Sequence, residues 1–293
     1  MNFLKKKHTR TSLIISGLSI LLFASCEKEN NDIATEENSD IASTIDVSTL
    51  TKLKNLGFEG NTAEVTNFIL PDGSSEKRYL VEGDIALSES YLNSFDIEKE
   101  VTGEQYRTFN LVTAIRTINV IGISEGQFAL PENSVEGLRR AIDNYNRLNL
   151  DIRFTLDFGF DGYQNFDMVV YYNPDERDSN GRLISGGVAG FPSRAGFPHQ
   201  LIRIYGIGNS NANVNEHVIT HEMGHSIGFR HTDFFSRSSC ANGRPEGAGS
   251  IGAEFIPGTA RREDPTSIMN ACFGAGVDGE FNRNDITALN FLY

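Results

Sequence analysis

The sequence has no tryptophan and only three cysteines among its 293 residues. So few cysteines exclude a disulfide-dense scaffold and a cysteine-rich zinc finger. Basic side chains are also scarce, since 26 Lys and Arg stand against 39 Asp and Glu, which gives a net charge of −13. Binding nucleic acid without sequence preference requires a basic surface, so we expect no nucleic-acid partner. A hydrophobic content of 39% is still sufficient for a packed core.

The N-terminus is basic, and its apolar run is too short to cross a membrane. Residues 1–25 contain four basic residues and no acidic one, and residues 13–24 form an apolar run of 12, whereas a spanning helix needs about 20. This pattern predicts a signal peptide. Its removal leaves 22 basic against 39 acidic residues, a net charge of −17.

The end of this segment resembles the lipobox of bacterial lipoproteins, because the sequence FASC ends at Cys26. In such proteins the cysteine is lipidated, for example with palmitate, and becomes the new N-terminus. We therefore expect an exported protein that a lipid at Cys26 anchors to the bacterial outer membrane or cell surface. The alternative is an ordinary signal peptide with an incidental cysteine.

Apolar periodicity locates several elements. Leu50, Leu53 and Leu56 predict a short helix that ends at Gly57. Alternation of apolar and polar residues over 150–158 predicts a half-buried strand. Further strands are expected at residues 79–81, 111–123, 168–172 and 201–205. Two pairs have the form of a helix capping box, namely Asn133 with Glu136 and Asn213 with Glu216.

The histidines are the most informative residues, because four of the six lie between His217 and His231. His221 and His225 are four residues apart on the helix expected after Asn213, so both can bind one metal ion. Gly228 favours a left-handed turn that ends this helix, and the returning chain can bring His231 to the same ion. Three neutral imidazoles leave a fourth tetrahedral position open, as in catalytic zinc sites.

His217 lies one turn before His221, but a single zinc ion cannot use it together with His225. Residues 217, 221 and 225 span about 12 Å along a helix axis, and zinc–nitrogen bonds are about 2.0–2.1 Å long. The third ligand should therefore be His231. We expect His217 to be a packing residue or a partner of a ligand.

Glu222 directly follows the first expected ligand. Its carboxylate can reach a zinc-bound water without binding the metal, take a proton from it and deliver that proton to the leaving amine. Downstream, Met269 follows a turn signal at residues 264–267, and a methionine turn accompanies this zinc-binding string in the metzincins.

Three stretches together resemble the bacterial dual-action HEIGH metallopeptidases, which are metzincin-like zinc endopeptidases related to the astacin-like type. They are HEMGHSIGFRHTD at 221–233, SIMNAC at 267–272 and the closing NRNDITALNFLY. The resemblance covers about residues 79–293. It implies zinc ligands His221, His225 and His231, the base Glu222 and the Met-turn residue Met269. Astacin-like enzymes have a tyrosine two residues after the methionine, where this chain has Ala271.

The resemblance implies an α+β fold with two lobes. The twisted sheet and the active-site helix would form the upper lobe, and the Met-turn and a C-terminal helix the lower one. We expect a signal peptide over 1–25, a flexible acidic tether over 26–46, a pro-like or N-terminal extension over 47–107, and the catalytic domain over 108–293.

The expected function is that of a secreted, lipid-anchored zinc endopeptidase. It would be a monomer that acts on protein or peptide substrates and reaches the membrane through its anchor. The alternative is a surface lipoprotein that binds peptides or glycans and has a vestigial zinc site. An intact Glu222 and the lack of a fourth protein ligand in the string favour the enzyme.

Further residues have weaker signals. Cys240 and Cys272 would lie outside the cytoplasm, where disulfides persist, so we expect a bridge rather than two free thiols. Asp233 either orients a ligand histidine or caps the following turn. The segment 173–181 is rich in Asp and Asn and is either a calcium site or a plain loop. Residues 187–191 form either an edge strand that pairs with substrate or a loop.

Asp84 is a candidate latency switch. Val81-Glu82-Gly83-Asp84 resembles the F-x-G-D motif of astacin pro-segments, in which the aspartate blocks the zinc, although Val81 replaces the phenylalanine. A carboxylate is a good zinc ligand, and Gly83 would let the backbone approach the metal closely. The alternative is that Gly83 and Asp84 only form a turn after the strand at 79–81.

Overall fold

The computed structural model describes residues 45–58, 63–95, 106–178, 180–241, 243–260 and 263–293. The predicted signal peptide, Cys26 and nearly all of the predicted tether lie outside the described residues. The helices are α1 (Val47–Leu56), α2 (Glu89–Asn93), α3 (Glu132–Asn146), α4 (Ala212–Ile227) and α5 (Arg283–Leu292), with 3-10 turns η1 (Tyr163–Asn165) and η2 (Gly249–Ile251). The strands are β1 (Glu64–Ile69), β2 (Ser75–Val81), β3 (Ile85–Ser88), β4 (Tyr106–Arg107), β5 (Thr117–Ile123), β6 (Arg153–Gly159), β7 (Met168–Asn173), β8 (Gly186–Val188), β9 (Leu201–Tyr205) and β10 (Glu254–Phe255). Over these ranges, every helix is too short or too polar to span a membrane.

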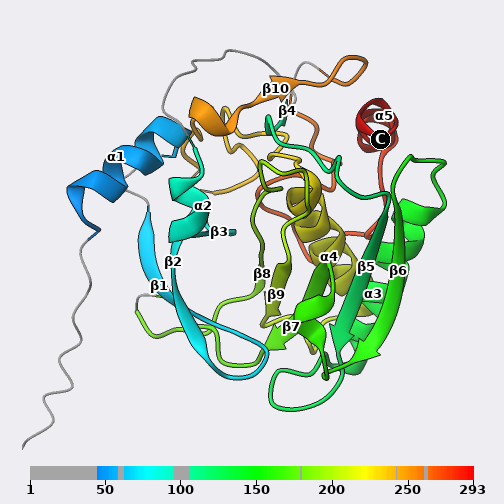
Figure 1. Ribbon diagram of the computed structural model, residues 1–293. Helices are drawn as coiled ribbons and strands as arrows, with labels where there is room; N and C mark the ends of the chain where they lie inside the picture. The colour runs from blue at the N-terminus through cyan, green and yellow to red at the C-terminus, as the bar shows by residue number, and fades with distance from the viewer. Residues whose placement is uncertain (1–44, 59–62, 96–105, 179, 242, 261–262) are drawn as a thin grey trace, which may run out of the picture. The chain divides into compact units, whose positions relative to one another are not determined.

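A five-stranded mixed sheet is the centre of the fold, with strand order β6-β5-β7-β9-β8 (Figure 1). The first four strands are parallel, and β8 pairs antiparallel with β9 at one edge. The short β4 and β10 form a separate antiparallel pair. A mixed sheet with separate helices and a second antiparallel sheet confirms the expected α+β class.

Both faces of the central sheet are buried, which explains why β7 is apolar along most of its length. Met168 and Val170 face a core that they share with α3, α4 and α5, whereas Val169 and Tyr171 belong to a second core that includes Phe68 of β1. Successive side chains of a strand point to opposite faces. The strand therefore needs apolar residues at odd and even positions alike.

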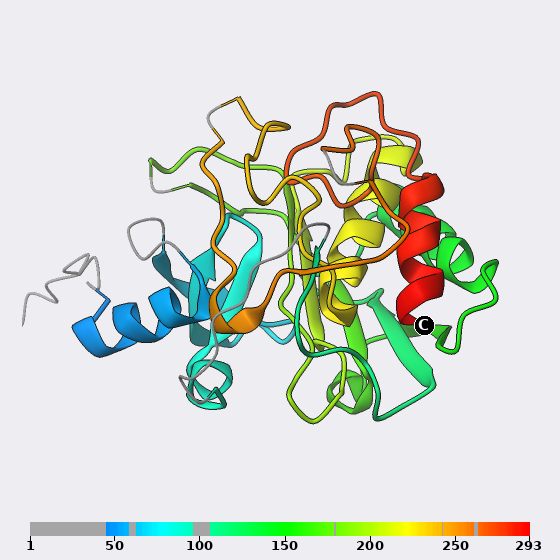
Figure 2. The same cartoon turned by 90° about the horizontal axis from the view of Figure 1, so that it is seen from above.

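The N-terminal segment folds as a helix and a three-stranded antiparallel sheet, β1-β2-β3. In Figure 2 this segment, in blue and cyan, lies on the side of the central sheet opposite to α3 and α5. Its apolar side chains pack with Phe191 and Ile251 from later parts of the chain. At the start of β3 the backbone meets the continuation of β8, since Ala86 N donates to Ala189 O at 2.8 Å. The segment is therefore packed as an integral part of the folded unit.

Most elements lie where the sequence predicts them, but several boundaries differ. The helix that ends at Gly57 is α1, and Gly57 is left-handed with φ 99°. The strand expected over 111–123 begins only at Thr117. Thr113 and Ala114 donate their backbone N–H groups to Gly196 O instead. This loop contact replaces the strand pairing that the β-branched residues of 111–123 suggest.

Both predicted capping boxes are wrong. Helix α3 begins after Pro131, which makes no side-chain cap. Helix α4 is capped by Asn211, whose side chain accepts from Val214 N. Two asparagines stand two residues apart at the start of α4, and the one with extended backbone becomes the cap.

Two segments with open alternatives have defined structures. In the segment 173–181, the Asp178 carboxylate accepts hydrogen bonds from Asn180 N and Arg182 N, so this aspartate organises the loop, and calcium binding stays an untested alternative. Residues 186–188 form the edge strand β8, which agrees with the edge-strand alternative for the neighbouring residues 187–191.

Candidate metal centre

Helix α4 places two of the predicted ligands on one face. Its residues from Val214 to Ile227 are all buried, so the helix runs through the interior instead of along the surface. At its end Gly228 has φ 115°, and its N–H donates to the carbonyls of Gly224 and His225. A Cβ at residue 228 would come within 2.9 Å of Asn110 O. Glycine is therefore required here both for backbone conformation and for space, and the turn returns the chain to His231.

The structure brings together the three predicted ligand histidines. His225 Nε2 lies 3.0 Å from His221 Nε2 and 3.2 Å from His231 Nε2. Two imidazole nitrogens bound to one tetrahedral metal at about 2.0–2.1 Å would be about 3.3 Å apart. The observed spacing therefore fits nitrogen ligands that share one metal ion.

Each of the three rings is oriented through its other nitrogen. His221 Nδ1 lies 2.8 Å from Ile268 O, and His225 Nδ1 lies 2.8 Å from Phe229 O. His231 Nδ1 lies 2.7 Å from the carboxylate Oε1 of Glu246. Because Nδ1–H donates in each case, the lone pair of Nε2 is free to bind a metal. Burial, and then the two neighbouring imidazoles, lower the pKa of His225, which keeps this ring in the neutral form that ligation needs.

Asp84 completes the cluster from the N-terminal segment. Its Oδ2 lies 2.9 Å from His231 Nε2 and 3.8 Å from His221 Nε2. Asp84 sits at the tip of the β2–β3 hairpin, so the predicted turn is present and its aspartate still faces the histidines. No atom of the described chain lies within 4 Å of a Cβ built at Gly83, so packing does not demand a glycine here. The glycine is needed for its φ of 93°.

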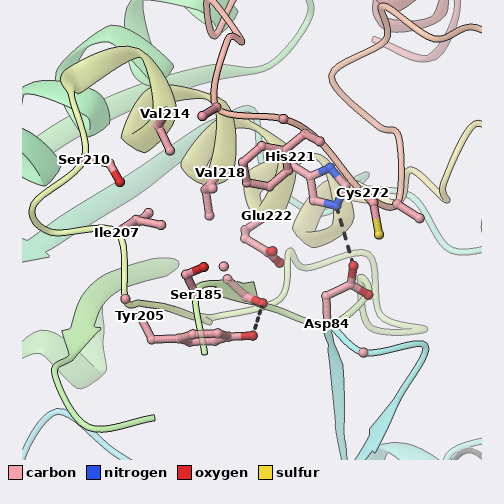
Figure 3. Close-up of a pocket in the computed structure, with 18 of the residues that line it drawn as sticks. Asp84, Ser185, Tyr205, Ile207, Ser210, Val214, Val218, His221, Glu222 and Cys272 are labelled. Carbon is pink, nitrogen blue, oxygen red and sulfur yellow. Dashed lines mark hydrogen bonds and ion pairs between the residues drawn. The ribbon is translucent and has the colours of Figure 1, made fainter. Parts of the chain in front are cut away.

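Glu222 lines a cavity of about 480 Å³ next to His221. Figure 3 shows Glu222 between His221 and Tyr205, with Asp84 across the cavity. The Glu222 side chain packs on the edge strand, where a Cβ at Gly187 would come within 2.6 Å of its Oε1. Burial, and then the Asp84 carboxylate, raise the pKa of Glu222 well above its usual range. A raised pKa suits a group that must accept and then release a proton.

Met269 packs against α4 at the glycine of the HExxH string. A Cβ at Gly224 would come within 2.5 Å of the Met269 sulfur, so the missing side chain makes room for the methionine. The turn that carries Met269 is fixed by Asp285 of α5, which accepts from Ser267 Oγ at 2.6 Å and from Ile268 N at 3.0 Å. The same turn places the Ile268 carbonyl against His221.

His217 is not one of the clustered histidines. It is buried, and its ring packs on Phe273 with 4.6 Å between the ring centroids. Burial, followed by the nearby His221, lowers its pKa to about 3. These contacts agree with the predicted packing role.

The residue that faces the third ligand is not Asp233, for which the sequence left two roles open. Asp233 accepts hydrogen bonds from Ser239 N at 2.9 Å and Ala271 N at 3.0 Å, which favours the turn-capping alternative. The group that orients His231 is Glu246, which has no local sequence signal. Its distance of 15 residues from His231 crosses an irregular loop, so only the folded chain reveals the pairing.

The expected disulfide is present between Cys240 and Cys272. It links the loop after His231 to the segment after Met269, beside the hydrogen bonds of Asp233. Cys272 and Ala271 both line the cavity. The position where astacin-like relatives have a tyrosine therefore faces the cavity as alanine. Tyr205 lies on another wall, and its hydroxyl donates to Gly187 O at 2.9 Å (Figure 3).

Comparisons with known proteins address the same region. The family described as dual-action HEIGH metallo-peptidase matches residues 79–293. A comparison with curated protein sequences gives no match. Among solved structures, the crystal structure of myroilysin is similar at 15% sequence identity and a TM-score of 0.35, over 58% of this chain and 80% of that one. The family match spans more than half of the chain and includes the whole histidine cluster, so this chain belongs to the dual-action HEIGH metallopeptidases.

Proposed function

We propose that this metallopeptidase is a zinc endopeptidase with a metzincin-like site, in which His221, His225 and His231 bind the metal. The observation that carries the proposal is the convergence of three Nε2 atoms beside the buried Glu222. Three imidazoles with an open fourth position are the donor set of catalytic zinc. The packing of Met269 under Gly224 supports the metzincin-like arrangement.

Zinc, when bound, supplies a water of lowered pKa and polarises the scissile carbonyl. Glu222 takes the proton of the attacking water and delivers it to the leaving amine. Once the hairpin has left, the edge strand β8, which packs against Glu222, would present its outer edge to an extended peptide. Gly187 keeps this strand close to Glu222 because it has no side chain to separate them.

We further propose that the uncleaved chain is latent. The Asp84 carboxylate occupies the place beside His221 and His231 that water needs, and the same hairpin holds the edge of the sheet. Ala189 N donates to Asp84 O at 2.9 Å, so backbone pairing and the carboxylate block the site together. Cleavage between about residues 96 and 107 would separate the extension (47–107) from the catalytic domain (108–293) and allow the hairpin to leave.

One substitution at the expected catalytic base tests the peptidase function. Glu222→Gln should retain near-stoichiometric zinc and lose about 10²–10⁴-fold in turnover of an unfolded protein substrate, because it removes the base and no ligand. Zinc content is measured by elemental analysis and turnover on the cleaved chains, and a chelator should abolish the activity of the cleaved wild type. Equal activity of Glu222→Gln and the wild type would contradict the proposal.

The expected export and anchoring at Cys26 are part of the same proposal. Cys26→Ser should move the protein out of the detergent phase or leave the signal peptide uncleaved. Unchanged partitioning into detergent would exclude lipidation at this cysteine. The control is Ser39→Ala, a substitution elsewhere in the predicted tether, which should leave partitioning unchanged.

A further inference from the structure

Two arginines enclose the tip of the N-terminal hairpin behind the metal centre. Arg230 Nη2 donates to Glu82 Oε1 at 2.7 Å. Arg237 Nη1 donates to the backbone carbonyl of Glu82, also at 2.7 Å. Arg230 is fully buried, and the side chains of Glu82 and Arg237 are 6% and 15% exposed. Arg230 and Arg237, which we call the arginine pair, therefore hold Glu82 from two sides.

The arginine pair also contacts Glu246, but that carboxylate has another task. Glu246 accepts from Arg237 Nη1 at 2.6 Å and lies 3.4 Å from Arg230 Nη2. Its Oε1 is also the partner of His231 Nδ1. Arg230 thus contacts both carboxylates, whereas Arg237 contacts the Glu246 carboxylate and only the backbone of Glu82. Glu246 belongs to the metal centre and Glu82 to the hairpin. Departure of the hairpin would leave the two cations with one carboxylate, and an unpaired buried charge is strongly disfavoured.

Glu82 lies at the cavity that contains the metal centre. Glu82, Asp84 and Arg237 line the same cavity as His221 and Glu222. A guanidinium is a planar donor that suits a carboxylate, and Arg230 Nε has no hydrogen-bond partner within the described part of the chain. The rings of Phe191 and Phe234 lie about 5.8 and 5.7 Å from the Arg230 guanidinium, so its position is fixed by packing.

The backbone at Glu82 indicates that its side chain is held in place by these contacts. Its φ is 56°, a left-handed conformation that non-glycine residues seldom adopt. The contacts with the arginine pair compensate for it. The hairpin therefore presents two carboxylates two residues apart, one at the histidines and one at the arginine pair. In an extended peptide, residues i and i+2 point to the same side, about 7 Å apart.

We propose that the arginine pair is a substrate subsite for an acidic side chain, which Glu82 fills in the uncleaved chain. The substrates are peptides with a glutamate or aspartate within a few residues of the scissile bond. The subsite rests on the proposed peptidase function and on displacement of the hairpin. It adds a chemical preference that neither of these implies.

Paired peptides test the preference with the full chain after limited proteolysis at residues 96–107. Each pair differs only by Glu or Gln, at one of three positions on either side of the scissile bond. At one position kcat/KM should be at least about tenfold higher for Glu, mainly through KM, as expected for a charge-assisted contact. Arg230→Gln should reduce this ratio to about one, because Arg230 is the arginine that contacts the Glu82 carboxylate. The exposed Arg244 of the following loop gives the matched control, since Arg244→Gln should keep the ratio.

A binding measurement tests the same subsite without catalysis. In the full chain, Glu82→Gly removes the side chain and suits the left-handed backbone. Propionate, which reproduces the missing carboxylate, should raise the thermal unfolding temperature of this variant at millimolar concentration. Propionamide should have no effect, and neither compound should act on the wild type.

The outcomes separate the subsite from the peptidase. If the peptides are cleaved and no position distinguishes Glu from Gln, the subsite is wrong and the peptidase function stands. If no peptide is cleaved, the peptidase function fails. In that case, stabilisation of Glu82→Gly by propionate but not by propionamide supports an anion site at the arginine pair. The lack of any stabilisation by propionate overturns that site.

Discussion

Two regions of this molecule meet at the same three imidazole rings, and they differ in how they reach them. The segment from Ala212 to His231 supplies all three histidines within one helix and one turn. The β2–β3 hairpin supplies Asp84 from 147 positions away from His231. The first region is arranged by rules that act between near neighbours, namely helical spacing and a left-handed glycine. The second is arranged by packing between distant parts of the chain.

This difference means that one region forms the metal centre and the other controls access to it. The three ligands are brought together by α4 and its turn, although Ile268 and Glu246 orient two of the rings. A blocking carboxylate that depends on tertiary contacts can be removed without dismantling the histidines. We expect variants of the two regions to have opposite effects, with loss of metal in one and gain of activity in the other.

Removing a ligand from the local region should have the largest effect. His231→Ala takes away one of three nitrogens and leaves two, which should strip the metal and abolish activity. His225→Ala should behave alike. Metal content after dialysis, measured beside activity, checks this. Retention of full zinc occupancy by His231→Ala would make the ligand assignment wrong.

Removing the long-range carboxylate should act in the opposite direction. Asp84→Ala should raise the activity of the uncleaved chain about 10- to 100-fold, the range expected for one charge-assisted contact. The measurement compares full-length wild type, Asp84→Ala and the cleaved chain on one substrate. Ser90→Ala, on an exposed position of the same segment, is the control. A full-length wild type as active as the cleaved chain would eliminate the latency proposal.

A third variant sharpens the comparison, because Glu246 belongs to the metal centre although no local rule places it. Glu246→Gln keeps the side-chain size and removes the charge that faces His231 Nδ1. We expect metal affinity or activity to fall about 10- to 100-fold, as for other partners of metal-ligating histidines. Competition with a zinc chelator measures the affinity. An unchanged affinity together with unchanged activity would show that His231 needs no carboxylate partner.

The smallest effect is expected at His217, which lies in the local region but outside the cluster. His217→Ala should keep the metal and lose less than the roughly tenfold that a partner of a ligand contributes. Its cost should appear in thermal stability, because the ring is buried against Phe273. If His217→Ala lost zinc and His231→Ala kept it, the spacing argument along the helix would fail.

The local region is where sequence interpretation was most successful. The HExxH spacing, Gly228 and His231 lie within eleven residues, and each acts through geometry that a few residues determine. The expected exclusion of His217 followed from the rise per residue of a helix alone. Even here the start of α4 was placed two residues too late, since the capping asparagine is selected by the backbone conformation before the helix.

The sequence by itself determined the family, the three clustered histidines, the neighbouring Glu222 and the pairing of Cys240 with Cys272. It also singled out Asp84 and left a plain turn as the alternative, and the folded chain combines the two. Only the tertiary structure decided that Glu246 rather than Asp233 faces His231, that Met269 packs on Gly224, and that the arginine pair holds Glu82. The physical reason is range. Helical spacing and turns are fixed between neighbours, whereas a buried charge takes whichever partner the packed chain brings within reach.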